Sequence, residues 1–311
     1  LIMIFWIASY PKSGNTWLRA LLSSYYYSED GCFNQKLLEN IGQFPEKKYL
    51  RSFNYNSKIA SDTSRFWIKA QELINKDSKI KFFKTHNILG AIDNNKFTNE
   101  KNSIGGLYVV RDPRNVITSI QNHYELKIDE ALKFMLSETK FIFDRNTEND
   151  FSDFQFISSW EKNYQSWIRQ KIFPIKIVKY EDLNNKTFEV FKEIICFIDS
   201  ITENRKNFNK LKAKNSIETT TFSKMKKIEE ENGFVESKFY KSLDIYDRVG
   251  GGDGFASGFI YGVMQGLSLE KSINLGVAHG ALAMTTPGDT SMVSIEEVEN
   301  LLKNSSARVS R

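Results

Sequence analysis

A stretch near the start of the chain, SYPKSGNTWLRALL, combines a lysine, hydroxyl side chains and a glycine in the way that anion-binding loops do. It follows an apolar run, IMIFWIA, and apolar residues then recur between positions 18 and 25 at the spacing of an amphipathic helix. Backbone N–H groups at such a helix start, from Ser13 to Thr16, can hold an anion, and Lys12 adds a positive charge. The loop lacks the first glycine of the GxxxxGK[ST] motif. The sequence therefore predicts an anion site that differs from the usual site for ATP or GTP.

A second apolar run, IKFFKTHN, ends in a histidine that could act as a base. His86 is one of only three histidines in the chain. A lone histidine at the end of a strand is more often structural than catalytic. Lys84, two residues earlier and therefore on the same face of a strand, favours a base beside an anion site.

A third run, LYVVRDPRNVITSIQNHY, reads as a strand followed by a helix. Asp112 can cap the helix, and Pro113 suits its first position. Arg111 and Ser119 could then bracket one phosphate from the strand end and from the helix. The alternative is that Arg111 pairs with Asp112 or with a neighbouring carboxylate.

Two further features concern the surroundings of these residues. Val116, Ile120 and His123 recur at i, i+4 and i+7, so we expect His123 to lie along the packed side of the helix. A fourth strand, IKIVKYEDL, ends at Tyr180, which can also be a tyrosine at the edge of the core. Because parallel sheets bind ligands at the carboxyl ends of their strands, these four segments predict an α/β fold with one site at that edge.

Bulk composition sets the broad class of the protein. The 311 residues are 41% hydrophobic and 26% charged, which is typical of a globular protein and not of a disordered one. The 43 basic and 38 acidic residues nearly balance, so charge gives no reason to expect nucleic acid as a partner. Two cysteines without metal-ligand spacing predict no disulfide framework and a cytoplasmic location. The longest apolar run near the start is too short for a membrane span.

The chain changes character near residue 243. Residues 243–311 hold ten of the 17 glycines and none of the five tryptophans. No linker rich in proline, glycine or serine marks the change. The shift predicts two pieces of different origin, residues 1–242 and 243–311; the alternative is one domain with a glycine-rich end.

Taken together, the four segments resemble the sulfotransferases that use 3′-phosphoadenosine 5′-phosphosulfate (PAPS). YPKSGNTW is similar to the 5′-phosphosulfate loop of that family, usually written YPKSGTTW, with Asn15 in place of a threonine. KTH resembles the segment with the second lysine and the catalytic histidine, and RDPRNVITS resembles the 3′-phosphate motif. YEDL and TTFSKMKKIEEENGF, residues 220–234, are similar to segments that meet the adenine. The resemblance extends over about residues 3–240 and implies a P-loop-like parallel sheet flanked by helices.

The resemblance also implies roles for the matching residues. His86 would deprotonate an acceptor hydroxyl or amine, Lys12 would neutralise charge on the leaving phosphate oxygen, and Lys84 would steady the transferring sulfuryl group. Arg111 and Ser119 would hold the 3′-phosphate of PAPS. The implied catalytic set is Lys12, Lys84, His86 and Ser119, with no metal ion. The implied donor-binding set is Lys12, Ser13, Gly14, Asn15, Thr16, Trp17, Arg111, Ser119, Tyr180, Thr220, Phe222 and Met225, of which Trp17 and the last four would line the adenine.

The chain departs from that family after residue 234. The family continues with an Arg-Lys-Gly element that closes over the 3′-phosphate, whereas this chain runs through GFVESKFYKSLD into a glycine-rich segment. That segment resembles the C-terminal end of a ribokinase-type (PfkB family) sugar kinase, most closely a 2-keto-3-deoxygluconate kinase. The resemblance implies a helical fragment of a different α/β fold. It also implies an anion-binding turn followed by a catalytic aspartate at Gly250, Gly251, Gly252 and Asp253.

Three hypotheses follow from these two resemblances. The first is a PAPS-dependent sulfotransferase with a foreign tail, acting on a small-molecule or saccharide acceptor. The second is a protein related to sugar kinases, and the third is an inactive fusion that retains nucleotide binding at most. We also expect the helix-like stretches 254–266 and 270–284 to expose apolar surface or to be loosely attached, because they normally pack on a sheet formed by the rest of the kinase.

Overall fold

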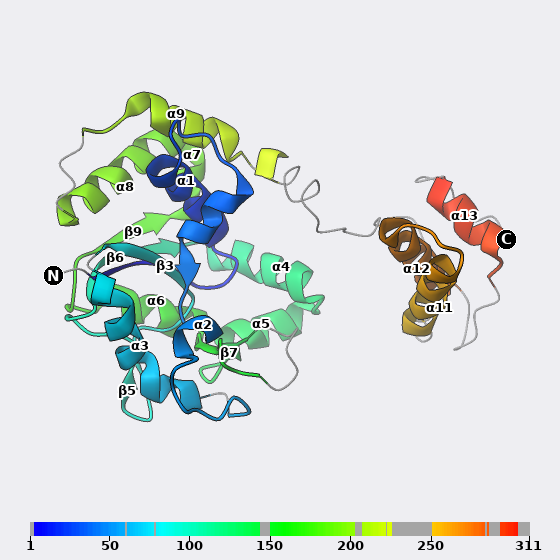
Figure 1. The fold of residues 1–311 in the computed structure, drawn as a ribbon, viewed down its shortest axis with the longest axis horizontal. Coiled ribbons are helices and arrows are strands. Elements are labelled where there is room, and N and C mark those ends of the chain that lie inside the picture. The colour runs from blue at the N-terminus through cyan, green and yellow to red at the C-terminus, as the bar shows by residue number, and fades with distance from the viewer. Residues whose placement is uncertain are drawn as a thin grey trace. The chain divides into compact units, whose positions relative to one another are not determined.

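The computed structural model describes residues 3–59, 61–77, 79–143, 150–202, 207–221, 223–225, 251–283, 285 and 293–303. The chain divides into two compact units, Leu1–Met225 and Lys226–Arg311 (Figure 1). The boundary predicted between residues 242 and 243 lies outside the described residues.

A parallel sheet of five strands forms the centre of the first unit. Its order is β2-β3-β1-β6-β9, and every neighbouring pair is parallel. The strands are β1 (Ile4–Ser9), β2 (Gly42–Gln43), β3 (Lys81–Thr85), β6 (Ser103–Val110) and β9 (Ile175–Lys179). The predicted parallel α/β sheet is therefore confirmed.

Helices cover both faces of this sheet. Every residue of β1 is buried, as expected of a central strand, and alternate side chains enter different cores. Phe5 and Ile7 pack in one hydrophobic cluster, and Trp6 and Ala8 pack in the other. The first cluster includes residues of α1 (Asn15–Tyr27), α8 (Thr187–Ile201) and α9 (Lys210–Thr219), and the second includes residues of α3 (Trp67–Ile74) and α6 (Trp160–Ile168) (Figure 1).

Shorter elements connect these layers and extend from the carboxyl edge of the sheet. They are η1 (Gln35–Asn40), α2 (Lys47–Leu50), η2 (Asp62–Phe66), η3 (Asn75–Asp77), β4 (Ala91–Ile92), β5 (Asn95–Lys96), α4 (Pro113–Tyr124), α5 (Ile128–Leu136), β7 (Phe141–Ile142), β8 (Gln155–Phe156) and α7 (Tyr180–Asn185). A third cluster, which includes Val116, Ile120 and Phe134, joins α4 to α5.

Helix α4 begins as predicted, but the prediction for its last turn is wrong. The side chain of Asp112 accepts a hydrogen bond from the Arg114 backbone N–H, and proline occupies the first position. His123, however, is exposed, with its ring 4.7 Å from that of Tyr124. The packed face also includes Ile117 and Tyr124, so its centre is turned toward these residues and away from His123, which lies about 60° around the helix from Ile120. His123 therefore lies beside this face and not within it.

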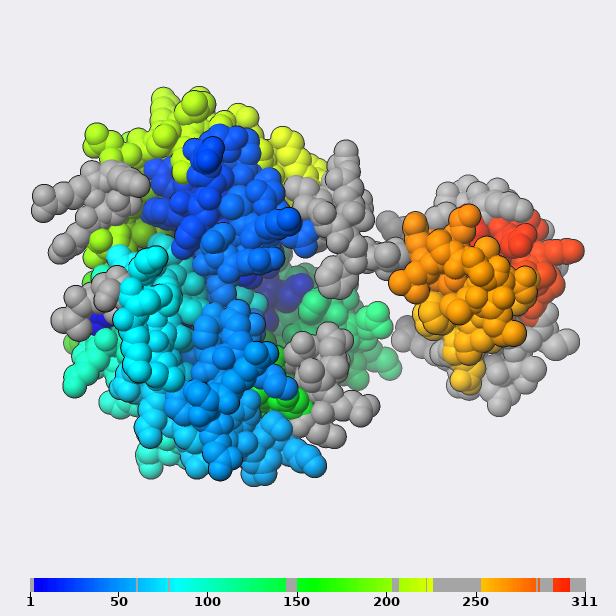
Figure 2. All heavy atoms as spheres, in the orientation of Figure 1, coloured from blue at the N-terminus to red at the C-terminus, as the bar shows by residue number. Residues whose placement is uncertain are grey.

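The second unit is helical where it is described. It contains α11 (Gly251–Met264), α12 (Leu269–Ala283) and α13 (Ile295–Lys303). Glycines 254, 258 and 262 of α11 face α12 so closely that a Cβ added to Gly258 would lie 2.7 Å from the Leu275 carbonyl oxygen. Large apolar side chains of α11, including those of Ile260 and Met264, are exposed, and this helix forms part of the orange surface in Figure 2. The expected exposure of apolar surface is thus present in the stretch 254–266, whereas no large apolar side chain is exposed among the described residues of 270–284.

Among the residues that the structure describes, no helix is both long and apolar enough to span a bilayer.

Candidate functional site

The four strand ends that carry predicted site residues lie next to one another. In the sheet order, β1 lies between β3 and β6, and β9 follows β6. Because these strands are parallel, the segments that follow Ser9, Thr85, Val110 and Lys179 all leave the same edge (Figure 1). The fold therefore brings Lys12, His86, Arg111 and Tyr180 to one side of the sheet.

The loop between β1 and α1 depends on two residues in the left-handed backbone region. Lys12 has a φ of 65° and Gly14 a φ of 95°. A Cβ on Gly14 would lie 2.4 Å from Cδ2 of Tyr180, so only glycine fits here without displacing the ring. Helix α1 starts directly afterwards at Asn15, and its first N–H groups have no partners within the helix. The predicted helix start is therefore present, and the backbone N–H groups of its first turn lie at the carboxyl edge of the sheet.

The side chain of Asn15 points into the protein. It is buried, and its Nδ2 donates to the Ile7 carbonyl oxygen at 3.0 Å and to Ser9 Oγ at 3.1 Å. Asn15 therefore ties the loop to β1, and only its backbone is available to the predicted anion.

His86 is held through its backbone and one ring nitrogen. Its Nδ1 lies 2.7 Å from the Ser9 carbonyl oxygen, which can only accept a hydrogen bond. Nδ1 is therefore the protonated nitrogen, and Nε2 keeps a lone pair. The backbone N–H of His86 donates to Gln155 Oε1 at 2.8 Å, and its carbonyl oxygen accepts from Asn163. This arrangement presents Nε2 as a base.

Electrostatics keeps this imidazole neutral. Burial lowers the pKa of His86 well below 6.5, and the positive charges of Lys84, Arg19 and Lys12 lower it further. The hydrogen bond to the Ser9 carbonyl raises the pKa, but by less than these other effects lower it.

Lys84 lies in the same electrostatic environment. Burial, with Arg19 and Lys12 nearby, lowers the pKa of Lys84 to about 8. Its Nζ donates to Gln43 Oε1 at 3.1 Å. Because like charges brought together favour a bound anion, this cluster is suited to a phosphate or sulfate group.

Three residues of this site, Arg19, Gln43 and Gln155, are not predicted by any motif or spacing in the sequence. Arg19 lies on α1, and its Nη2 donates to the carbonyl oxygens of Leu38 and Ile41 at 3.2 and 2.7 Å. The three residues act on Lys84 or His86 through contacts between distant parts of the chain. Lys12 lies before α1 and outside its periodicity, so no local pattern of the sequence singles out Arg19.

Arg111, Trp17 and Tyr180 form a second group at this edge. The Arg111 guanidinium lies 4.6 Å from the centre of the Tyr180 ring, and its Nη1 donates to the Lys12 carbonyl oxygen at 3.1 Å. The Trp17 ring meets that of Tyr180 edge-on at 5.9 Å. Asp112 forms its ion pair with Arg114, so the suggested pairing of Arg111 with Asp112 is not the arrangement adopted.

Three buried hydrogen-bond donors in this area have no acceptor in the described part of the chain. They are Ser13 Oγ, Trp17 Nε1 and Arg111 Nε. A buried donor without a partner costs free energy, of the order of 1–3 kcal/mol each. A ligand rich in acceptor oxygens, such as a phosphate ester, would satisfy them.

The other residues predicted to contact PAPS are Ser119, Thr220, Phe222 and Met225, and those that the structure describes differ in burial. Ser119 is half-buried on α4. Thr220 is buried at the end of α9, and its hydroxyl donates to the Ser216 carbonyl oxygen at 2.7 Å. Met225 is half-buried, and Phe222 lies outside the described residues.

In the second unit, the predicted turn is described only in part. Gly250 lies outside the described residues, Gly251 and Gly252 open α11, and Asp253 is exposed in its first turn. His279 Nδ1 lies 2.9 Å from Ser257 Oγ. No group of side chains suited to a metal ion occurs among the residues that the structure describes.

Comparison with known proteins gives different relatives for the two ends of the chain. The model of the pfkB family of carbohydrate kinases matches residues 226–296. The 2-dehydro-3-deoxygluconokinase of Bacillus subtilis (strain 168) is 49% identical over 45 residues, which are 14% of this chain and 14% of that protein. The 2-dehydro-3-deoxygalactonokinase of Haloferax volcanii is 34% identical over 68 residues, 22% of this chain and 21% of that protein. The chain thus spans only a small part of each kinase, and the predicted kinase-like C-terminal fragment is confirmed.

Two solved structures are similar to the chain at low identity. Retinol dehydratase in complex with androsterone and inactive cofactor PAP gives a TM-score of 0.44 at 15% identity and covers 74% of this chain and 68% of that one. Mouse sulfotransferase SULT7A1 complexed with PAP gives 0.40 at 14% identity, covering 97% and 81%.

The larger match in sequence is to the model of the sulfotransferase domain, which extends over residues 4–243. It includes the strands, the β1–α1 loop and the site described above, and it covers most of the chain. The protein therefore belongs to the sulfotransferase domain family.

Proposed function

We propose that this protein transfers a sulfuryl group from PAPS to the hydroxyl or amine of an acceptor, with His86 as the general base. The observation that carries the proposal is the set of buried donors without acceptors beside the start of α1. PAPS would supply an activated sulfuryl group and two phosphate-bearing ends that accept hydrogen bonds.

In this proposal, one group of residues binds PAPS and His86 accepts the proton. Ser13 and the first N–H groups of α1 bind the 5′ end of the donor, and Arg111 binds its 3′-phosphate together with Ser119. Trp17 and Tyr180 offer aromatic faces to the adenine. His86 Nε2 removes the acceptor proton, because its Nδ1–H is engaged by the Ser9 carbonyl.

Lys12 and Lys84 stabilise charge. Sulfuryl transfer, like phosphoryl transfer, depends on in-line positioning and on stabilising charge that develops during the reaction. Lys12 neutralises the negative charge that develops on the leaving phosphate oxygen, and Lys84 neutralises the charge on the transferring sulfuryl group. Lys12→Ala should therefore lower kcat more than it weakens donor binding.

Calorimetry with two nucleotides tests the proposal. We expect 3′-phosphoadenosine 5′-phosphate to bind the full chain and ATP to bind at least tenfold more weakly, because Arg111 and Ser119 recognise a 3′-phosphate that ATP does not have. Arg111→Ala should remove this preference. Preferential binding of ATP would contradict the proposal.

The closing element of the family is replaced in this chain. Residues 235–244, where Arg-Lys-Gly is expected, lie outside the described residues. Each hydrogen bond between a charged donor and phosphate contributes about 1.5–3 kcal/mol, so we expect donor affinity to be lower by one or more orders of magnitude than with the usual ending. Lys238 or Lys241 can replace part of that contact.

A second candidate function is suggested by the pfkB match. Asp253 lies in the first turn of a helix that follows glycines, as a kinase aspartate would. Residues 4–243 match a different family, and the curated kinases are matched over only 14% and 21% of their lengths. We therefore propose that the C-terminal unit does not phosphorylate sugar acids. Kinase turnover with 2-keto-3-deoxygluconate that Asp253→Asn abolishes would overturn this.

A further inference from the structure

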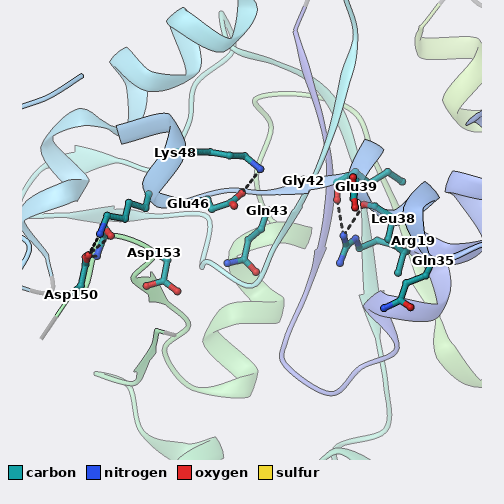
Figure 3. Close-up of a pocket in the computed structure, with 13 residues that line it drawn as sticks. Arg19, Gln35, Leu38, Glu39, Gly42, Gln43, Glu46, Lys48, Asp150 and Asp153 are labelled. Carbon is teal, nitrogen blue, oxygen red and sulfur yellow. Dashed lines mark hydrogen bonds and ion pairs between the residues drawn. The ribbon is translucent and has the colours of Figure 1, made fainter. Parts of the chain in front are cut away.

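A cavity of about 900 Å³ opens beside Lys84. Residues from α1, the η1–α2 segment and the segment before β8 form its walls (Figure 3). The lining residues are Arg19, Gln35, Leu38, Glu39, Ile41, Gly42, Gln43, Glu46, Lys47, Lys48, Asp150, Ser152 and Asp153. Part of this wall is the blue surface in Figure 2.

The cavity adjoins the proposed reaction residues, although neither Lys84 nor His86 is among the residues that line it. Gln43, which lines it, accepts the hydrogen bond from Lys84 Nζ. Arg19, which also lines it, lies close enough for its charge to lower the pKa of both Lys84 and His86. An acceptor that extends from the cavity past Gln43 would therefore approach Lys84 and the proposed site of transfer.

The chemistry of the lining is unusual for a small-molecule pocket. Pockets of roughly 300–1,000 Å³ are lined mostly by apolar and aromatic side chains. Here Leu38 and Ile41 are the only large apolar residues among those that line the cavity, and none is aromatic. A flat apolar acceptor would displace water from the polar groups of this lining without forming hydrogen bonds in its place, which opposes its binding.

The charges of the lining are balanced and arranged in pairs. Lys48 Nζ lies 2.8 Å from Glu46 Oε2, and Lys47 pairs with Asp150 (Figure 3). Arg19 is engaged with backbone carbonyls. Glu39 and Asp153 add two further carboxylates. A lining with three basic and four acidic residues gives no general attraction for a polyanion, but it offers many donors and acceptors to hydroxyl and amine groups.

We propose that this cavity binds the acceptor and that the acceptor is a neutral or amine-bearing saccharide. The inference rests on the proposed sulfuryl transfer. A sugar hydroxyl loses its proton to His86 Nε2, its oxygen bonds to the sulfur of PAPS, and the bond from sulfur to the 5′-phosphate oxygen breaks. The products are the sugar sulfate and 3′-phosphoadenosine 5′-phosphate.

An acceptor panel tests the class of substrate. The full chain is given PAPS with chitotriose, kanamycin, 4-nitrophenol, a sterol or desulfated heparin that keeps its carboxylates. We expect kcat/KM for chitotriose or kanamycin to exceed that for 4-nitrophenol and the sterol at least 100-fold, because sites built for hydrogen bonds reject ligands that lack them. A phenol, sterol or polyanion as the best acceptor would overturn the inference.

Donor binding separates failure of this inference from failure of the proposed function. If 3′-phosphoadenosine 5′-phosphate binds but neither saccharide is sulfated, the acceptor class is wrong and the donor site stands. If the nucleotide does not bind, the proposed function fails and the inference fails with it.

Variants on opposite walls test the location of the acceptor. Glu39→Ala and Asp153→Ala should each raise KM for the saccharide about tenfold or more, through loss of hydrogen bonds to a charged group. Their affinity for 3′-phosphoadenosine 5′-phosphate should stay unchanged, which checks that the donor site is folded. Asp129→Ala, an exposed change on α5, is the matched control and should leave KM unchanged. If neither wall variant raises KM, the cavity is not the acceptor site.

Discussion

Three positively charged side chains act on one imidazole at this site. Lys84, Arg19 and Lys12 all lower the pKa of His86, and Arg19 and Lys12 also lower that of Lys84. Without an anion these charges repel one another, and a bound phosphosulfate would relieve the repulsion. The same field that would attract the proposed donor therefore keeps His86 deprotonated.

The pH dependence of kcat/KM for PAPS should reflect these two groups, since this parameter reports the free enzyme. The rate should rise as the pH rises through the lowered pKa of His86, well below 6.5, because the base must be neutral. It should fall as the pH rises through about 8, because Lys84 must be charged. Lys84→Arg should move the falling limb to higher pH; a limb that stays in place would assign it to another group.

Removal of the base should cost far more than removal of another histidine. His86→Ala should lower kcat about 10²–10⁴-fold, the usual contribution of a general base. His123→Ala is the matched control, since that ring is exposed on α4. Steady-state rates with a common acceptor measure both. A loss of activity in the His123 variant alone would refute the role given to His86.

At the scale of elements, the site depends on the connection between β1 and α1. This loop packs Gly14 against Tyr180, the first residue of α7, and so couples the first and last strand ends of the site. A short loop fixed in this way holds the N–H groups of α1 in place before the donor arrives.

Gly14→Ala should disrupt this connection. The new Cβ would collide with Tyr180 while the backbone keeps a φ of 95°. We expect a loss of about 1–3 kcal/mol in unfolding free energy and at least tenfold weaker binding of 3′-phosphoadenosine 5′-phosphate. Gly266→Ala is the control, because Gly266 also has a positive φ but nothing lies within 4 Å of an added Cβ. Thermal melts and calorimetry measure both, and equal nucleotide affinity in the Gly14 variant would contradict the prediction.

Local sequence patterns predict the helices and strands around the site, but they do not predict contacts between residues far apart in the chain. The apolar runs, the Asp112 cap and the buried face of α1 each depend on residues close in the chain, and all were predicted. Gln43 and Gln155 reach Lys84 and His86 across 41 and 69 residues, and no periodicity encodes such contacts. Asn15 resembled a loop ligand by position, but its side chain bonds to β1.

At the scale of the whole molecule, the two units differ in their cores. The largest cluster of the first unit contains 17 buried residues, whereas that of the second contains five among the residues described. A small core gives little stability, since less apolar surface leaves water on folding. Glycines at the α11–α12 interface bring the helices close but contribute no side chains.

We therefore expect proteases to cleave residues 243–311 faster than residues 1–242. Limited digestion followed by mass spectrometry gives the order of the cuts. Adding 3′-phosphoadenosine 5′-phosphate should protect the first unit and leave cleavage of the second unchanged, because only the first carries the proposed site. Protection of both units, or faster loss of the first, would count against this prediction.

The distribution of tryptophan has a spectroscopic consequence. Trp6, Trp67 and Trp167 are fully buried in the first unit, and the second unit contains no tryptophan. Tryptophan emission therefore reports only on the sulfotransferase unit, while circular dichroism at 222 nm reports on the helices of both. Unfolding curves from the two signals should not coincide. A two-state fit to either signal alone would therefore give one unfolding free energy for a chain whose two units unfold separately.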